Sequence, residues 1–338
     1  MIEEATAIVE DLQISQIYLQ RGGILVSAVC SHFSTLCVFV FDLWIQWHMV
    51  ILSPIVLLFI LPGFILILLY GTALFLHIYQ HRRRQIYDAY ASNFWEGARS
   101  SVAAFYDAQA TLWHGYEAHG LENIPDEGGA LLIYYHGALP IDVYYMMGRI
   151  KTAKKRNLRN VVAEFLFYIP GFQILMDVFG CVTGPIDECV SILKNGELLA
   201  ISPGGVREAL FSDENYKMIW NSRIGFAKVA LKAQVPVIPV FTQNVRETFR
   251  TLKMGRRLFR WIYEKTKCPI VPIWGGFPVK LRTYFGKPIT IDPSQKPEEI
   301  ARCVHKEIHA LITEHQKLPG SILRGLKERV YNSSSKKA

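Results

Sequence analysis

An uncharged stretch of 38 residues constrains this chain more than any other feature of its sequence. Residues 43–80 contain no Asp, Glu, Lys or Arg. As one helix they would be about 57 Å long, whereas the hydrocarbon core of a bilayer is about 30 Å thick. Pro62 and Gly63 divide the stretch into two halves of about 28 Å each. We therefore predict a membrane hairpin over residues 43–80 that turns at Pro62 and Gly63.

The flanks of this stretch predict its orientation. Trp44, Trp47 and Tyr79 lie near its ends, where aromatic side chains mark the membrane interface. The sequence His-Arg-Arg-Arg follows at once over residues 81–84, and basic residues beside a span remain in the cytosol. We expect an integral membrane protein with both termini and the C-terminal bulk in the cytosol, so that the sequon at Asn332 stays unglycosylated.

The segments beside the hairpin have intermediate character. Residues 1–42 begin with a polar segment, and residues 24–41 are apolar but interrupted by hydroxyl groups and a histidine. We predict an interfacial helix over residues 24–41, with a further span as the open alternative. Residues 81–119 carry aromatic side chains at helical spacing. They predict amphipathic connecting helices that rest on the membrane surface or on a globular domain.

Residues 120–320 alternate short apolar runs with helix-length segments. This alternation is typical of an α/β domain with a largely parallel sheet flanked by helices. A polar tail over residues 321–338 would follow. The runs of strand length are residues 130–135, 161–163, 198–201, 235–241 and 270–273, and the predicted helices are residues 141–150, 189–193, 222–233 and 298–317.

Charge and cysteine usage exclude some partners. The net charge of +8 suits nucleic acid, an anionic membrane leaflet or an anionic cofactor, and the hydrophobic N-terminal third favours the last two. Six cysteines form no CxxC pair, which argues against a disulfide framework or a zinc site and fits a reducing compartment. We therefore expect no nucleic-acid partner and no metal.

Two groups of basic residues follow the predicted strands. They form a solvated or membrane-facing stripe, or they dock the phosphates of coenzyme A. The groups are Lys151, Lys154, Lys155, Arg156 and Arg159, and then Arg246, Arg250, Lys253, Arg256, Arg257 and Arg260.

A histidine on a strand-to-helix turn is the first candidate catalytic residue. His136 follows the apolar run, and Pro140 suits the first position of the next helix. Asp142 could hold one ring nitrogen of His136 if the turn folds back. The other nitrogen would then accept a proton from a substrate hydroxyl. A histidine that only caps the strand end is the alternative.

A glycine-rich segment after residues 198–201 is the second candidate. Gly204 and Gly205 would let the backbone approach a ligand, and their amides could face an anion or a developing oxyanion. Arg207 adds a fixed positive charge, and Glu208 adds a carboxylate. Such a segment by itself is usually only a turn.

In combination the two segments resemble a known family. A strand with His-x5-Asp, a strand with Pro-Gly-Gly-x-Arg-Glu, and then Val-Pro-Val-Ile-Pro-Val occur in the order found in the glycerolipid acyltransferase superfamily. The similarity is greatest to the branch near the monoacylglycerol and diacylglycerol acyltransferases, and covers about residues 112–320. It implies that His136 is the general base, that Asp142 orients it, and that no covalent acyl-enzyme forms. It also implies substrate-binding roles for Gly204, Gly205, Arg207 and Glu208 toward the acceptor, and for Pro236 and Pro239 toward the acyl donor.

Two departures from the family pattern concern the assignment of Asp142 and the acceptor. Five residues separate His136 from Asp142, where the superfamily usually has four, so the turn must absorb one more. Enzymes with phosphorylated acceptors carry Glu-Gly-Thr-Arg where this chain has Pro-Gly-Gly-Val-Arg-Glu. The second difference points toward an uncharged acylglycerol, although Arg207 leaves a phosphorylated acceptor open.

We therefore expect a membrane-bound O-acyltransferase, in the endoplasmic reticulum, that makes neutral glycerolipid such as triacylglycerol. Its partners would be the bilayer, a mono- or diacylglycerol acceptor and an acyl donor. Acyl-CoA or another lipid would serve as that donor, without a bound cofactor. The alternatives are a lysophospholipid acyltransferase, a non-catalytic lipid-binding or scaffold protein of the membrane, and a lipid hydrolase that needs no acceptor.

Overall fold

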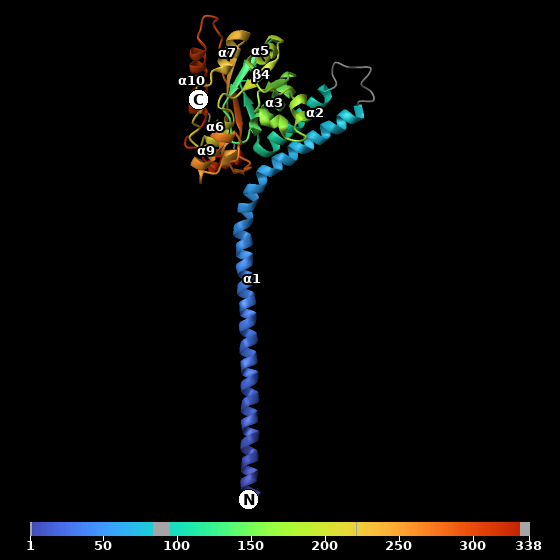
Figure 1. Cartoon of the computed structure of the whole chain (residues 1–338), viewed down its shortest axis with the longest axis vertical. Helices are drawn as coiled ribbons and strands as arrows, with labels where there is room; N and C mark the ends of the chain where they lie inside the picture. The colour runs from blue at the N-terminus through green and yellow to red at the C-terminus, as the bar shows by residue number, and fades with distance from the viewer. Residues whose placement is uncertain (1, 84–94, 221, 332–338) are drawn as a thin grey trace. The chain divides into compact units, whose positions relative to one another are not determined.

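The chain consists of a long N-terminal helix and an α/β domain. The computed structural model describes residues 2–83, 95–220 and 222–331. It separates into two compact units, residues 1–57 and 58–338. The first unit is part of helix α1, Ile2–Arg83, and the second holds the rest of α1 and the α/β domain (Figure 1).

Helix α1 continues through Pro62 and Gly63, so the hairpin turn expected there is not formed. A proline removes one hydrogen bond of a helix, but helical backbone satisfies nearly all the other polar groups of an apolar stretch without water. Two stretches of α1 are apolar and long enough to cross a membrane, by length and composition only: Ser34–Val56 and Leu58–Tyr79. The stretch Ser34–Val56 overlaps the helix predicted at residues 24–41 only over residues 34–41.

The sheet of the second unit is largely parallel, which confirms the predicted fold class. Among the described residues of the six-stranded sheet, only β5, Val237–Gln243, and β8, Arg282–Phe285, pair in antiparallel fashion. Two further strands, β6 Phe249–Thr251 and β7 Ile273–Gly275, form a separate antiparallel pair. In spatial order the six strands are β1 Glu117–His119, β8 Arg282–Phe285, β5 Val237–Gln243, β2 Ala130–Tyr134, β4 Leu198–Ile201 and β3 Leu158–Asn160.

The apolar runs in the sequence correctly predicted the central strands of the sheet, but they did not reveal the outer strands. Strands β2, β4 and β5 confirm the predictions for residues 130–135, 198–201 and 235–241 within two residues at each end. The run at residues 161–163 lies just after β3, and Val161 forms only an isolated bridge to Val182. Strands β1 and β8 are three and four residues long and partly polar, so no apolar run marks them.

Alternate side chains of β2 fill the two sides of the sheet, as the period of a strand requires. Leu131 and Ile133 join a buried cluster that includes residues of α5 Ile186–Lys194, α7 Gly225–Ala233 and α10 Pro297–His315. Ala130 and Leu132 face a second cluster that includes residues of α3 Ile141–Lys154. Helices therefore cover both faces, and the sheet is buried on both (Figure 1).

The connecting region packs against the domain. Helix α2, Glu96–Gln109, buries Val102 and Tyr106 in a cluster with Leu69 and Leu76 of α1 and residues of α4 Gln173–Val178. We predicted that helices in residues 81–119 rest on the membrane surface or on a globular domain. In the described part of this region, α2 rests on the domain.

The C-terminal segment is more ordered than a polar tail. Residues assigned to that tail form helix α11, Ile322–Val330, whose Gly325 is buried and accepts a hydrogen bond from the Lys280 amide. The sequon at Asn332 lies outside the described residues.

Candidate active site

The two motifs meet at one edge of the sheet. Strands β2 and β4 are parallel neighbours, with Ile133 opposite Ile201, so the segments that follow them leave from the same edge. The backbone N–H of His136 donates a hydrogen bond of 2.9 Å to Oε1 of Glu208, which lies in helix α6, Gly205–Phe211. Ligand sites of parallel α/β sheets lie at this carboxyl edge. The structure therefore joins the residues that the sequence placed 72 positions apart.

His136 is in the protonation state that a general base needs. Its Nδ1 lies 2.7 Å from the carbonyl oxygen of Gly137, and a carbonyl can only accept, so the proton belongs on Nδ1. Nε2 then keeps its lone pair. Burial lowers the pKa of His136 to about 4, so the ring is neutral at pH 7. The side chain is half-buried, so part of it remains exposed to solvent.

The carbonyl of Gly137 takes the orienting position that we had expected Asp142 to occupy. Asp142 is buried in the first turn of α3, and its Oδ1 has no hydrogen-bond partner within the described residues. No hydrogen bond joins it to His136 in that part of the chain. With five intervening residues, Asp142 enters the helix near Thr242 of β5. Burial raises its pKa to about 7, although the Thr242 hydroxyl opposes this shift.

Glu208 clamps the backbone at the edge of the sheet. Its Oε1 accepts from the amide of His136 and its Oε2 from the amide of Ile219, at 2.9 and 2.8 Å. Burial raises its pKa to about 7, while both N–H donors favour the carboxylate. A Cβ atom on Gly204 would lie 2.3 Å from Cδ of Glu208, so this glycine makes room for the clamp. Gly205 has φ of +51°, a conformation that favours glycine.

Arg246 binds both motifs, and the prediction that it belongs to a solvated or membrane-facing stripe or to a coenzyme A dock is wrong. It is buried in the short helix α8, Val245–Thr248. Nη2 donates to the carbonyls of His136 and Glu208, and Nε donates to the Tyr135 hydroxyl at 2.6 Å. Nη1 donates to the carbonyls of Ala209 and Ser212. The guanidinium thus ties the end of β2 to α6. Because other basic residues follow Arg246 in the sequence, the sequence did not indicate that Arg246 is buried in this role.

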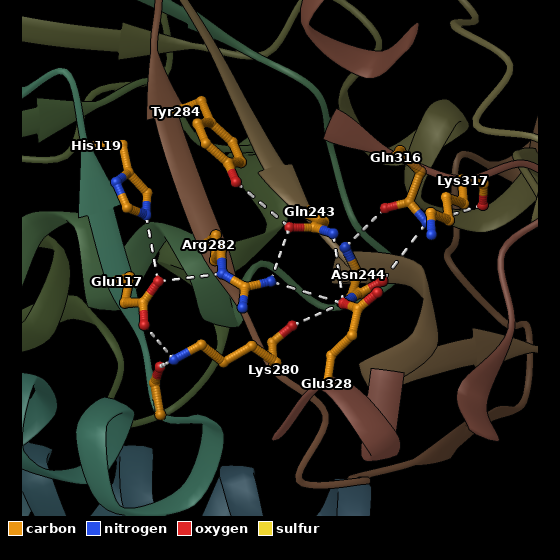
Figure 2. Close-up of polar contacts among 11 residues, drawn as sticks. Glu117, His119, Gln243, Asn244, Lys280, Arg282, Tyr284, Gln316, Lys317 and Glu328 are labelled. Atoms are coloured by element: carbon orange, nitrogen blue, oxygen red, sulfur yellow. Dashed lines mark hydrogen bonds and ion pairs between the residues drawn. The ribbon is translucent and has the colours of Figure 1, made fainter. Parts of the chain in front are cut away.

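A polar network holds α8 in place (Figure 2). Asn244, with φ of 62°, precedes the helix, and its amide N–H donates to Gln316 Oε1 at 2.9 Å. Its side chain donates to the Lys280 carbonyl and to Glu328 Oε2, both at 2.9 Å. Glu328 belongs to α11 and also pairs with Arg282. The C-terminal helix therefore supports the segment that carries Arg246.

The remaining candidate residues, Arg207, Pro236 and Pro239, make contacts with other residues of the protein. Nη2 of Arg207 donates to Glu264 Oε1 at 2.8 Å, while its Nε is buried without a partner among the described residues. Pro239 stands opposite Ile133 in the buried part of β5, and the Pro236 carbonyl accepts from the amide of Leu131. A donor-binding role for Pro236 and Pro239 stays a prediction.

Comparison with known proteins shows the class of protein to which this chain belongs. A family model described as Acyltransferase matches residues 115–243, which span β1 to β5 and both motifs. A bovine relative, "DGAT1/2-independent enzyme synthesizing storage lipids" from Bos taurus, is 55% identical over 282 residues, or 83% of this chain and 84% of the relative. The human relative of the same name is 54% identical over 281 residues, or 83% and 86%.

The chain therefore belongs to the acyltransferase family and is an acyltransferase. Within that family its relatives form the transmembrane protein 68 group of glycerolipid acyltransferases. Among solved structures, the crystal structure of the 1-acyl-sn-glycerophosphate acyltransferase PlsC from Thermotoga maritima aligns with a TM-score of 0.46 and 19% identity. That alignment covers 72% of this chain and 96% of PlsC.

Proposed function

We propose that the enzyme transfers a fatty acyl group to the free hydroxyl of a mono- or diacylglycerol and so makes neutral glycerolipid. The observation that carries the proposal is the neutral His136, with Nδ1 directed to the Gly137 carbonyl, at the edge where both motifs meet. The name of the bovine and human relatives supports the same product class.

In the proposed reaction Nε2 of His136 removes the proton of the acceptor hydroxyl. The oxygen attacks the carbonyl carbon of the acyl donor, which we propose is acyl-CoA. The C–S bond then breaks, and the leaving thiolate can take up the proton from the imidazolium. Catalytic hydrogen bonds often tighten only when substrate is bound, so we propose that Asp142 stabilises the imidazolium at that stage.

The state of Arg207 supports an uncharged acceptor. Glu264 compensates its charge at 2.8 Å, and Arg260 approaches the same carboxylate at 3.1 Å. An arginine that recognises a phosphate needs its N–H groups free for the anion. The Nε of Arg207, buried without a partner among the described residues, favours the second candidate, a lysophospholipid acyltransferase.

A panel of donors and acceptors tests this proposal. The purified full-length protein is reconstituted in liposomes and given radiolabelled acyl-CoA or acyl-labelled phospholipid, with monoacylglycerol, diacylglycerol or lysophosphatidate. We expect labelled di- and triacylglycerol from the first two acceptors. Product from lysophosphatidate alone would establish the second candidate, and fatty acid release without any acceptor would establish a hydrolase.

The pH dependence of kcat/KM provides a separate prediction. The pKa of His136 in the folded protein is about 4, below the ordinary value near 6.5. A base must be unprotonated, so its function as a base is lost only as the pH falls through the folded value. Protonation of His136 itself should abolish activity only below about pH 5, beneath a partial loss near pH 7 as the carboxylates of Asp142 and Glu208, whose pKa values are raised to about 7, take up protons. Complete loss of activity by about pH 5.5 would contradict the assignment of His136 as a buried neutral base.

We also propose that the enzyme resides in the membrane of the endoplasmic reticulum with its α/β domain in the cytosol. The two apolar stretches of α1 and the basic residues after them support this topology. Protease treatment of sealed microsomes should digest the domain, and the sequon at Asn332 should remain unmodified. A protected, glycosylated domain would reverse the orientation.

A further inference from the structure

Helix α9, Arg256–Thr266, and the residues beside it present large apolar side chains to solvent. Met254 is 78% exposed, and Leu258, Trp261 and Ile270 are each 58% exposed. Leu258 and Trp261 are three residues apart and so lie on one face of the helix, whereas Met254 precedes α9 and Ile270 follows it. We call these four residues, with the basic residues beside them, the α9 surface.

The opposite face of α9 is fixed to the domain. Tyr263 is buried and packs with Phe211 of α6, with ring centroids 5.7 Å apart, in a cluster that includes Val271. Phe259 adds to the same cluster. The inward face of α9 therefore packs on the domain. Folding of the domain does not require the exposed apolar residues. Grouped apolar residues at a surface mark an interaction site more often than scattered ones do.

The charges beside the α9 surface are almost all positive. Residues 253–267 contain six basic residues and one acidic residue, Glu264. Arg207 and Arg260 already pair with Glu264. Nζ of Lys265 lies 5.2 Å from the ring centroid of Trp261, so cationic and apolar groups adjoin. Apolar side chains bordered by lysine and arginine are typical of helices that lie in the interface of an anionic leaflet.

The same end of the domain carries an apolar stretch of α1. A Cβ atom on Gly276 would lie 2.8 Å from Cβ of Leu61, and Ile65 packs in the cluster that holds Ile273 and Phe277. Leu61 and Ile65 belong to the candidate span Leu58–Tyr79. Gly276 follows β7, which is paired with β6, and these two strands lead directly to the ends of the α9 surface. The apolar stretch of α1 and the α9 surface are therefore linked by one small sheet.

We propose that the α9 surface docks on a membrane leaflet that contains anionic lipid. Because α9 packs on α6, this contact would hold the carboxyl edge of the sheet, with His136, next to the lipid phase from which an acylglycerol must come. The docking surface goes beyond acyl transfer, and it can be tested without measuring any reaction.

Site-directed spin labelling of the full-length protein in nanodiscs tests the proposal. The native cysteines are replaced, and a nitroxide is attached at Leu258→Cys or at the exposed control Lys194→Cys. Lys194 ends α5, at the amino edge of the strands. The discs contain phosphatidylcholine with or without phosphatidylserine. We expect the label at position 258 to be accessible to oxygen and shielded from an aqueous nickel chelate in the anionic discs, with the reverse pattern at position 194.

Neutralising the charges should separate lipid docking from other contacts. Arg257→Gln with Lys265→Gln should lower the ratio of docked to undocked protein in anionic discs by about fivefold for each charge removed, with an unchanged circular dichroism spectrum. Equal exposure of positions 258 and 194 to the chelate would overturn the proposal. Dipolar broadening between two labels at position 258 would overturn it as well, because it would show a second copy of the chain on this surface. Either outcome would leave the acyl-transfer proposal intact.

Discussion

Replacing His136 by alanine is expected to lower acyl transfer by about 10²–10⁴-fold while the protein stays folded. The amide of His136 donates to Glu208 and its carbonyl accepts from Arg246, and both of these bonds use backbone atoms that alanine retains. The substitution therefore removes the proposed base without removing the supports of the turn. The measurement is kcat/KM for diacylglycerol acylation at saturating acyl-CoA, beside a thermal unfolding curve.

His309→Ala is the matched control. His309 is an exposed histidine of α10 whose Nδ1 lies 3.4 Å from the hydroxyl of Thr313 in the same helix, and its loss should change neither rate nor stability. A His136→Ala enzyme that keeps wild-type kcat/KM would remove the general base from the mechanism. A variant that loses activity only because it unfolds would show a lowered melting temperature, which the same experiment records.

Arg246→Lys should have the largest effect of any conservative substitution in this domain. The guanidinium donates to five different acceptors, and an ammonium has three protons and no planar fork. At least two buried carbonyls would lose their donors, at about 1–3 kcal/mol each. We expect the free energy of unfolding to fall by about 2–6 kcal/mol.

The positioning role of Arg246 predicts a kinetic signature as well. At a temperature where the variant is fully folded, kcat should fall with little change in KM for diacylglycerol, because the turn of His136 loses its anchor rather than a substrate contact. Arg302→Lys, at an exposed site of α10, is the control and should be neutral. Full kcat in a folded Arg246→Lys protein would show that the guanidinium contributes to stability alone.

Local patterns were sufficient for the centre of the domain. Strands β2, β4 and β5 are buried on both faces and therefore read as continuous apolar runs, which is why their positions could be predicted. His136 and the segment at residues 204–208 were identifiable because each directly follows such a run. Parallel pairing of β2 and β4 then brings the two segments together without any further information.

The turn expected at Pro62 and Gly63 shows where a local pattern misleads. Proline and glycine disfavour helix in isolation, but each affects only its own turn, whereas the apolar residues on both sides favour helix throughout. The predicted hairpin also required two full crossings of a bilayer. In the structure part of the second stretch is buried against the domain, with Leu69, Ala73 and Leu76 inside a core cluster.

The sequence by itself determined the central strands of the sheet, the turn that carries His136 and the class of chemistry, because these depend on side chains a few residues apart. Only the tertiary structure decided what holds that turn. Arg246 reaches His136 across 110 positions, and Glu328 reaches Asn244 across 84. A hydrogen bond between such distant residues leaves no periodic pattern in either segment, so a buried anchoring arginine and a surface arginine look alike until the chain has folded.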